Sequence, residues 1–179
     1  VWKDRDSLGL SEEQLRVLML TRRGFVRAGA ELTGEARDRL TAIKERLAVL
    51  ATQFVQNLLA DERDWYMELA PDDLDGLPDF VLTAASAAAK EKGIDGHVIT
   101  TSRSLITPFL QFSPRRDQRE KAYRALSARG ANGGETDNRE IAREILELRE
   151  KRAKLLGYDS FATYKLETEM AKTPDAVRD

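Results

Sequence analysis

Apolar residues recur along most of the chain with the period of an α-helix. Between residues 40 and 58 they follow steps of three and four, which places them in one stripe along a long helix. The stripe consists of Leu40, Ile43, Leu47, Leu50, Phe54 and Leu58. A shorter helix is predicted before it, where Ser11 and Gln14 form a capping-box signature. Because the two helices join near Thr33, we expect them to pack as an antiparallel hairpin.

Two short segments break this period and predict β-strands. Residues 65–69 are rich in aromatic side chains, and residues 97–101 are rich in β-branched ones. An alanine-rich helix is expected between them, over residues 80–92, with Gly93 at its end. We expect the strands to pair antiparallel. Because two strands alone are marginally stable in water, they must rest on the helices.

The remaining sequence predicts further helices. One covers residues 114–129 with Tyr123 facing inward, one starts at a cap formed by Asp137 and Glu140, and one is capped by Ser160. The inward side chains expected in the last two are Ile141, Ile145, Leu148, Leu155, Phe161, Tyr164, Leu166 and Met170. The predicted fold class is therefore mainly α, a helical bundle with one small two-stranded antiparallel ribbon.

Composition limits the functions that the chain can have. Its 29 Lys and Arg residues nearly balance 31 Asp and Glu residues, so the net charge of −2 does not favour nucleic acid or an anionic membrane as partner. No apolar run approaches the ~20 residues needed to cross a bilayer. The absence of cysteine excludes disulfides, thiolate catalysis and zinc sites built on cysteine, and it suits the reducing cytoplasm.

Both ends of the sequence suggest that it is part of something longer. The chain begins with Val1 rather than Met, and Thr173-Pro174 signals the start of a helix shortly before Asp179. We therefore expect residues 1–179 to be one helical fragment of a larger protein.

His97 is the only histidine, and it cannot form an active site by itself. A zinc site built on histidines needs at least two, and sequence spacing places no serine or aspartate beside His97 for a catalytic triad. We interpret His97 as a structural or solvated residue of its strand. The alternative is a contact with a ligand or another domain.

Three polar motifs have a functional and a structural interpretation. Arg103 could clamp a carboxylate, but a helix capped by Ser102 or Ser104 is favoured. The carboxylates of residues 61–64 could act in acid–base chemistry or bind a hard cation, but a solvated helix end is favoured. Gly133-Gly134 could bind an anion weakly, although a turn explains the pair.

Aromatic residues with basic neighbours can bind single-stranded nucleic acid, but core packing is the better explanation without a positive face. The aromatic residues in question are Trp65, Tyr66, Phe109, Phe112, Tyr158 and Phe161. The sequence also lacks a phosphate-binding loop. We therefore assign no catalytic or metal-binding residue, and the substrate-binding residues stay unknown.

Several stretches nevertheless form a recognisable order. They are residues 25–32, 54–59, 101–104 with Pro108 and Phe112, 119–125, 129–130, 136–138, 145–149, 153–158 and 170–174. Their order and spacing resemble the thimet-oligopeptidase-like zinc metallopeptidases, most of all bacterial peptidyl-dipeptidases and oligopeptidase A. The resemblance covers nearly the whole chain and corresponds to the helical part that precedes the catalytic zinc domain.

The resemblance implies a parent enzyme that hydrolyses short peptides, with zinc held by two histidines of a His-Glu-x-x-His motif and a distal glutamate. That motif is absent here, so the fragment alone is expected to bind no zinc and to be inactive. Its implied role is one wall of a deep cleft, with short peptides and the rest of the same polypeptide as partners. The isolated fragment is also expected to dimerise through its exposed surface. The alternative is a non-catalytic helical module that binds proteins through the stripe between residues 40 and 58.

Overall fold

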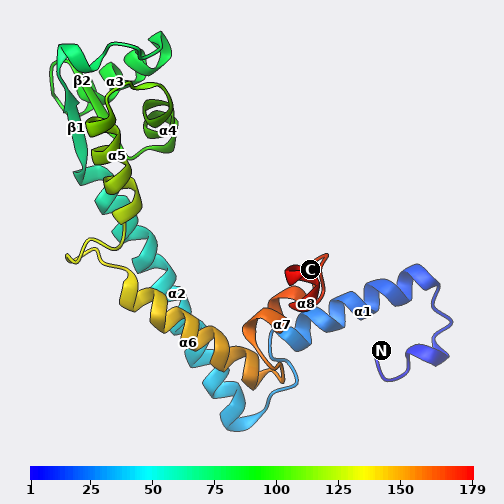
Figure 1. Ribbon diagram of the computed structural model, residues 1–179. Helices are drawn as coiled ribbons and strands as arrows, with labels where there is room; N and C mark the ends of the chain where they lie inside the picture. Colours follow the sequence, from blue (N-terminus) through cyan, green and yellow to red (C-terminus); the bar gives the residue numbers. More distant parts are fainter. The chain divides into compact units, whose positions relative to one another are not determined.

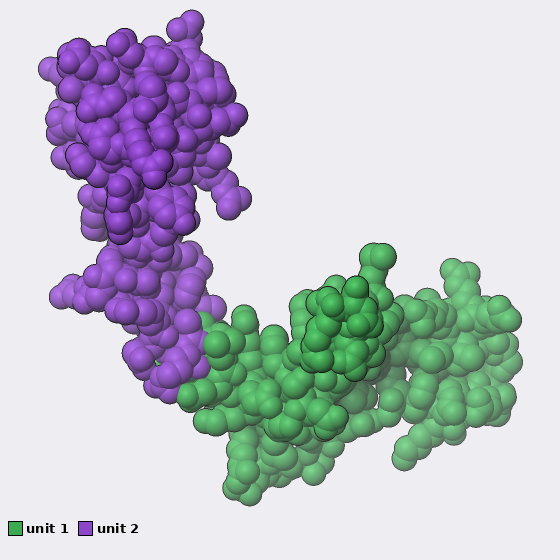
Figure 2. Space-filling view, in the orientation of Figure 1, with its two compact units in different colours: residues 1–50, 144–179 green, residues 51–143 purple.

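The computed structural model describes all 179 residues, which form eight α-helices, two 3-10 helices and one two-stranded sheet (Figure 1). The predicted fold class, mainly α with one small antiparallel ribbon, is confirmed. Two compact units divide the chain (Figure 2). One contains residues 51–143, and the other contains residues 1–50 and 144–179.

The ribbon lies in the unit of residues 51–143. Strands β1 (Tyr66–Leu69) and β2 (His97–Thr100) pair antiparallel as predicted, with Met67 opposite Ile99. The 3-10 helix η2 (Pro71–Asp73) follows β1. Val98 and Ile99 are both completely buried, so the ribbon does rest on the helices around it.

Helix α3 (Asp79–Glu91) connects the two strands and packs closely against β2. Its buried residues Val81, Ala85 and Ala89 follow one another at steps of four, so they share one face of the helix. Two of these three are alanines, and their small side chains let the helix backbone come close to its neighbours. This face explains why the sequence of α3 is rich in alanine.

Helices α4 (Arg103–Phe112) and α5 (Arg116–Ala128) complete this unit. Its core consists of Leu69, Leu77, Val81, Ala85, Ile99, Leu105, Ile106, Phe109 and Ala122. The predicted helix at residues 114–129 is confirmed as α5. The inward placement of Tyr123 is wrong, because its neighbour Ala122 takes the buried position and Tyr123 is 61% exposed.

Helix α2 (Gly34–Asp64) carries the predicted apolar stripe. Leu40 and Leu50 are buried, and the other four members of the stripe are half-buried. Helix α6 (Arg139–Leu155) runs beside α2 in Figure 1, where Arg46 of α2 pairs with Glu144 through two hydrogen bonds of 2.6 and 2.7 Å. The stripe is thus turned toward other parts of the same chain.

Helix α1 (Glu12–Arg27) follows the 3-10 helix η1 (Arg5–Ser7) and begins at the predicted capping box of Ser11 and Gln14. The expected hairpin with α2 is wrong: α1 buries no residue and does not run beside α2 in Figure 1. Its end is instead tied to the C-terminal segment, since Arg27 pairs with Glu167 and donates to the carbonyl of Tyr164 at 2.7 Å.

The last two helices are short. Ser160 caps α7 (Phe161–Leu166) as predicted. At the start of α8 (Asp175–Arg178), the amide of Ala176 donates a hydrogen bond of 3.2 Å to the hydroxyl of Thr173. Met170 was expected to face inward, but it is 99% exposed because α7 ends before it.

The buried face of α3 gives a test of the packing. Ala85→Val adds two methyl groups at a completely buried position, and such overpacking costs about 1–3 kcal/mol of unfolding free energy. Ala87→Val is the matched control, because Ala87 is an exposed residue of the same helix. Urea unfolding of both variants measures the difference. Equal destabilisation by the two substitutions would contradict the close packing of α3.

Candidate functional site

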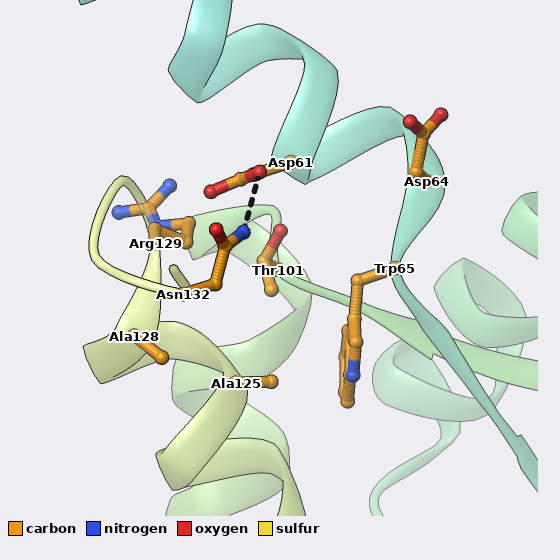
Figure 3. A pocket seen from close by; sticks show the side chains of 8 residues that line it. All are labelled: Asp61, Asp64, Trp65, Thr101, Ala125, Ala128, Arg129 and Asn132. Carbon is orange, nitrogen blue, oxygen red and sulfur yellow. Dashed lines mark hydrogen bonds between the residues drawn. The ribbon is translucent and has the colours of Figure 1, made fainter. Parts of the chain in front are cut away.

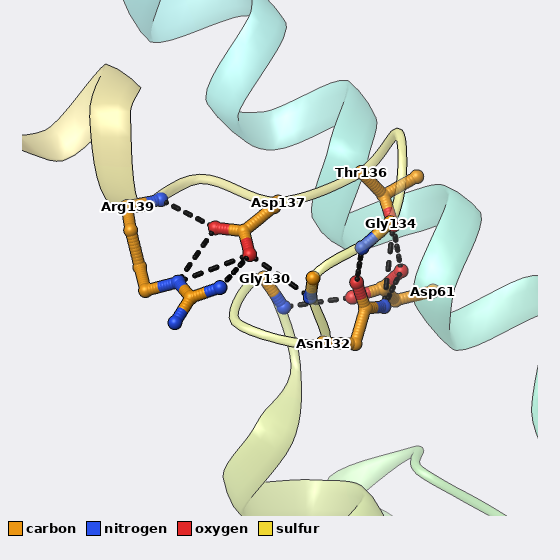
Figure 4. A network of polar contacts seen from close by, with 8 residues as sticks. Asp61, Gly130, Asn132, Gly134, Thr136, Asp137 and Arg139 are labelled. Carbon is orange, nitrogen blue, oxygen red and sulfur yellow. Dashed lines mark hydrogen bonds and ion pairs between the residues drawn. The ribbon is translucent and has the colours of Figure 1, made fainter.

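The segment between α5 and α6 folds back onto the last turns of α2, where Asp61 holds it (Figure 4). Asp61 accepts hydrogen bonds from the Gly130 amide at 2.7 Å, from the Asn132 side chain at 2.9 Å and from the Thr136 hydroxyl. Partial desolvation raises the pKa of Asp61, but these three donors outweigh it and hold its pKa below the usual value. Asp61 is therefore an anionic anchor for residues 130–136.

A second carboxylate, Asp137, fixes the other end of this segment. It accepts from the amides of Gly133 and Arg139, both at 2.9 Å, and from the Arg139 guanidinium at 2.5 Å. The Arg139 side chain is the main cause that holds the pKa of Asp137 well below its usual range. Asp137 does cap the start of α6. Glu140 does not complete a capping box, because it pairs with Arg143 instead.

The amides of Gly133 and Gly134 both donate hydrogen bonds to acceptors within the same segment. Gly133 donates to Asp137 at 2.9 Å, and Gly134 donates to the side chain of Asn132 at 3.0 Å. Because neither amide is left for a ligand, the favoured interpretation of this pair as a turn is confirmed.

Gly130 and Asn138 hold the segment between α5 and α6 closely against α2. Gly130 has a φ of 68°, and a Cβ at this position would lie 3.0 Å from Asn138 Nδ2 and 3.1 Å from Leu58 Cδ2. The buried Asn138 donates to the carbonyl of Phe54 at 3.0 Å and accepts from Asn57 at 2.9 Å. Only glycine fits here without strain.

Beside this anchor is a hollow of about 310 Å³, which we call the Trp65 hollow (Figure 3). It is lined by Asp61, Asp64, Trp65, Thr101, Ala125, Ala128, Arg129 and Asn132. The indole of Trp65 and the alanine methyl groups form apolar walls, while the aspartates, Arg129 and Asn132 form a polar rim. Such a combination is typical of small ligand sites, and the volume is at the lower end of their range.

The acidic motif at residues 61–64 has partners for every charge. Asp61 holds the segment of residues 130–136, Glu62 pairs with Arg129, and Arg63 pairs with Asp64 at 2.7 Å. The interpretation as a helix end rather than a cation site is thus the better one, although these side chains are more extensively paired than a solvated junction requires.

The residues present do not fit zinc. His97 is half-buried in β2 opposite Leu69, and it has no second histidine to join it. Nowhere do three His, Cys, Asp or Glu side chains come together in a group that could hold a metal ion. We therefore derive no chemical step through a metal at these residues.

Arg103 lies exposed in the first turn of α4, beside a second hollow of about 640 Å³. The helix predicted after the strand is confirmed, and Ser102 stands at its N-cap position. The predicted side-chain cap is wrong, because the Ser102 hydroxyl contacts the Ser104 hydroxyl at 3.0 Å and accepts no backbone hydrogen bond.

The aromatic residues have different environments. Phe109 is completely buried in the core, as predicted, and Tyr158 donates to Glu167 at 2.6 Å. Tyr66 and Phe112 are 42% and 40% exposed. Trp65 is half-buried and forms a wall of the hollow. Core packing therefore explains only part of this set.

Sequence reasoning missed two members of the Trp65 hollow, Thr101 and Arg129. Thr101 is 1% exposed and its hydroxyl oxygen has no hydrogen-bond partner, which is also true of the buried Nε of Arg129. The two residues are 28 positions apart in the sequence, so no local pattern shows that they share a site. The only signal in the sequence was the polar residue Thr101 directly after a strand that was expected to be buried.

Comparison with known proteins relates the chain to a family of peptidases. Residues 109–179 match the family model of Peptidase family M3. The chain is 38% identical over 181 residues to a dipeptidyl carboxypeptidase of Salmonella typhimurium, covering 99% of this chain and 26% of that protein. The chain is thus similar to this family over its C-terminal part and to a dipeptidyl carboxypeptidase over nearly its whole length. The resemblance drawn from its sequence is thereby confirmed.

Two further relatives extend this similarity. Oligopeptidase A of Escherichia coli is 35% identical over 163 residues, which are 88% of this chain and 24% of that protein. Saccharolysin of Saccharomyces cerevisiae is 26% identical over 181 residues, or 99% of this chain and 24% of that protein. The chain thus spans about a quarter of the length of the curated M3 relatives that it matches.

No helix of the chain combines the length and the apolar character that a bilayer-spanning helix requires.

Gly130 gives a test of the locked segment. Gly130→Ala should lower the unfolding free energy by about 2 kcal/mol or more, because it combines left-handed backbone strain with crowding against Asn138 and Leu58. Gly93→Ala has the same strain in open space and should cost about 1–2 kcal/mol. Gly134→Ala has neither feature and should change stability least. Urea denaturation ranks the three variants, and any other order would contradict the role of Gly130.

The pKa of Asp61 gives a test by pH. Because its pKa is lowered in the folded chain, Asp61 stabilises the fold above its unfolded pKa of about 4, and this contribution is lost as the pH falls through the folded value. Asp61→Asn should therefore be less stable than the original chain at pH 7, and the difference should shrink toward pH 3. Unfolding by urea across this range measures it.

The control for that test is Asp64→Asn. Asp64 makes an exposed ion pair with Arg63, and such pairs contribute little to stability. A difference for Asp61→Asn that does not depend on pH would contradict the anionic anchor.

Proposed function

We propose that this chain is the helical, cleft-wall portion of a zinc metallopeptidase that hydrolyses short peptides in the cytoplasm. The peptidase is of the peptidyl-dipeptidase or oligopeptidase type. The observation that carries the proposal is the 38% identity with a dipeptidyl carboxypeptidase, which extends over 99% of the chain. In this proposal the chain supplies a rigid surface beside the substrate, and the rest of a longer polypeptide supplies the reaction.

The chemistry of the side chains supports this division of roles. Zinc peptidases of this kind need two histidines and a glutamate around the metal, and this chain has a single histidine. Zinc, when bound, polarises the substrate and activates water. We therefore assign the zinc ligands to another part of the longer protein, and none of them to residues 1–179.

The packing within the unit of residues 51–143 supports a wall rather than a mobile lid. The last turns of α2 are tied to the segment of residues 130–138 by Asp61 and Asn138, through side-chain hydrogen bonds to both backbone and side-chain groups. Such cross-links restrict the movements by which a surface would adapt to a large, folded substrate.

No observation favours the alternative of a protein-binding module. That hypothesis required an exposed stripe between residues 40 and 58, whereas Leu40 and Leu50 are 4% and 1% exposed and the rest is half-buried. We therefore propose only the peptidase role.

The test compares the 179-residue chain with the longer gene product that contains it. Zinc content is measured by mass spectrometry, and hydrolysis is measured on a short blocked peptide and on a folded protein that contains the same sequence. We expect the longer product to contain zinc, to cut the short peptide and to lose activity with a chelator. The chain alone should do none of these.

Each other outcome would overturn one part of the proposal. A longer product without zinc and without activity removes the peptidase assignment. Zinc-dependent hydrolysis by residues 1–179 alone removes the non-catalytic role. Equal cleavage of the short peptide and the folded protein by the longer product removes the role of a confining wall.

A further inference from the structure

Helix α1 and residues of the C-terminal segment line a hollow of about 280 Å³, which we call the Arg23 hollow. Four arginines of α1 belong to its lining, namely Arg16, Arg22, Arg23 and Arg27, and Glu167 is the one carboxylate among them. This excess of positive charge is local, because the chain as a whole has a net charge of −2. The hollow therefore favours an anion although the molecule as a whole does not.

Two of these arginines are neutralised within the chain. Arg22 pairs with Glu31 at 2.5 Å, and Arg27 pairs with Glu167. Glu167 also accepts a hydrogen bond of 2.6 Å from the Tyr158 hydroxyl. The carboxylate of the hollow is therefore fully used, and it leaves the other two guanidinium groups without a counter-charge.

These two groups belong to Arg16 and Arg23, whose side chains form no hydrogen bond or ion pair within the chain. They are seven positions apart, and Arg27 follows four positions later, so all three lie on one face of α1. The hydrogen bond from Tyr158 is the main cause that lowers the pKa of Glu167, and the charge of Arg23 adds to it. Arg23 is thus close to the carboxylate of the hollow without being paired with it.

The hollow also has an apolar part, which Trp2, Met19 and Leu20 form. Met19 and Leu20 are 44% and 39% exposed, so a ligand can reach them. Two cation–π contacts hold the indole of Trp2, because the guanidinium carbons of Arg5 and Arg22 lie 4.5 and 4.7 Å from its ring centroid. A ligand with an apolar group beside its charge would contact both parts of the hollow.

The two unpaired guanidinium groups define the charge of the ligand. A guanidinium binds the oxygen atoms of carboxylates and phosphates in pairs. A carboxylate would neutralise only one of Arg16 and Arg23. A phosphate monoester has a charge near −2 once the pH exceeds its second pKa of about 6, so it neutralises both.

We propose that the Arg23 hollow binds a phosphate monoester that carries a small apolar group. The phosphate oxygens accept hydrogen bonds from Arg16 and Arg23, and the apolar group lies against Met19 and Leu20. The volume of about 280 Å³ is sufficient, because about 150 Å³ is enough for a benzene molecule. This site goes beyond the proposed function and does not depend on it, because it requires binding and no hydrolysis.

Three compounds test this assignment on the 179-residue chain at about pH 8, where a phosphate monoester is fully ionised. Phenyl phosphate is a dianion with a ring, phenyl sulfate has the same shape with a single charge, and inorganic phosphate has the charge without the ring. Binding is followed by the indole N–H resonance of Trp2, which is identified by its absence from Trp2→Phe. We expect phenyl phosphate to bind with millimolar affinity, as is usual for so small a ligand, and more tightly than the other two.

Two variants test the residues that make the contacts. Arg16→Gln and Arg23→Gln each remove one guanidinium, and each should weaken the binding of phenyl phosphate about tenfold, the usual effect of one lost hydrogen bond to a charged group. Neither side chain has a partner within the chain, so the melting temperatures should match that of the control variant. A loss of affinity is then not a loss of the fold.

Arg37→Gln is the matched control, since it removes the same charge from an exposed position of α2 that does not line the hollow. It should bind phenyl phosphate as the original chain does. The proposal is overturned if phenyl phosphate leaves the Trp2 resonance unchanged, if phenyl sulfate or inorganic phosphate binds as tightly, or if Arg16→Gln and Arg23→Gln bind as tightly as this control.

Discussion

The three hydrogen bonds accepted by Asp61 are the constraint on which the unit of residues 51–143 depends. They join the end of α2 to a segment that begins 69 residues later, at Gly130. With that segment in place, Asn138 reaches Phe54 and Asn57, and Arg129 reaches Glu62. The anchor thus also fixes the segment directly after α5, whose residues Arg129 and Asn132 line the Trp65 hollow.

Much of the fold could be predicted from the sequence because the signals are local. The stripe of α2, the capping box at Ser11, the N-cap at Ser160 and the alternation of strand and helix around α3 depend on neighbours within a few positions. The largest error arose where distant partners decide. α1 was expected beside α2, but Arg27 is bound by Tyr164 and Glu167, more than 130 positions away, and the sequence contains no trace of that choice.

The candidate site could be predicted only in part for the same reason. Residues 61–64 were recognised as an acidic cluster, and Trp65 as one of six aromatic residues assigned to core packing. Thr101 and Arg129, which line the same hollow, lie directly after β2 and α5, and no periodicity connects these elements. Sequence alone therefore favoured a solvated helix end, whereas the structure shows carboxylates that are paired with distant residues as well as with near ones.

The division of the chain into units has a consequence for its synthesis. The unit of residues 51–143 is continuous, whereas the other is assembled from residues 1–50 and 144–179. On the ribosome the continuous unit has all of its residues once position 143 has emerged. The discontinuous unit must wait for Glu144 before Arg46 finds its partner, and for Glu167 before Arg27 does. Helix α1 is thus made before the continuous unit but fixed after it, and in that interval its exposed residues Met19 and Phe25 are open to chaperones.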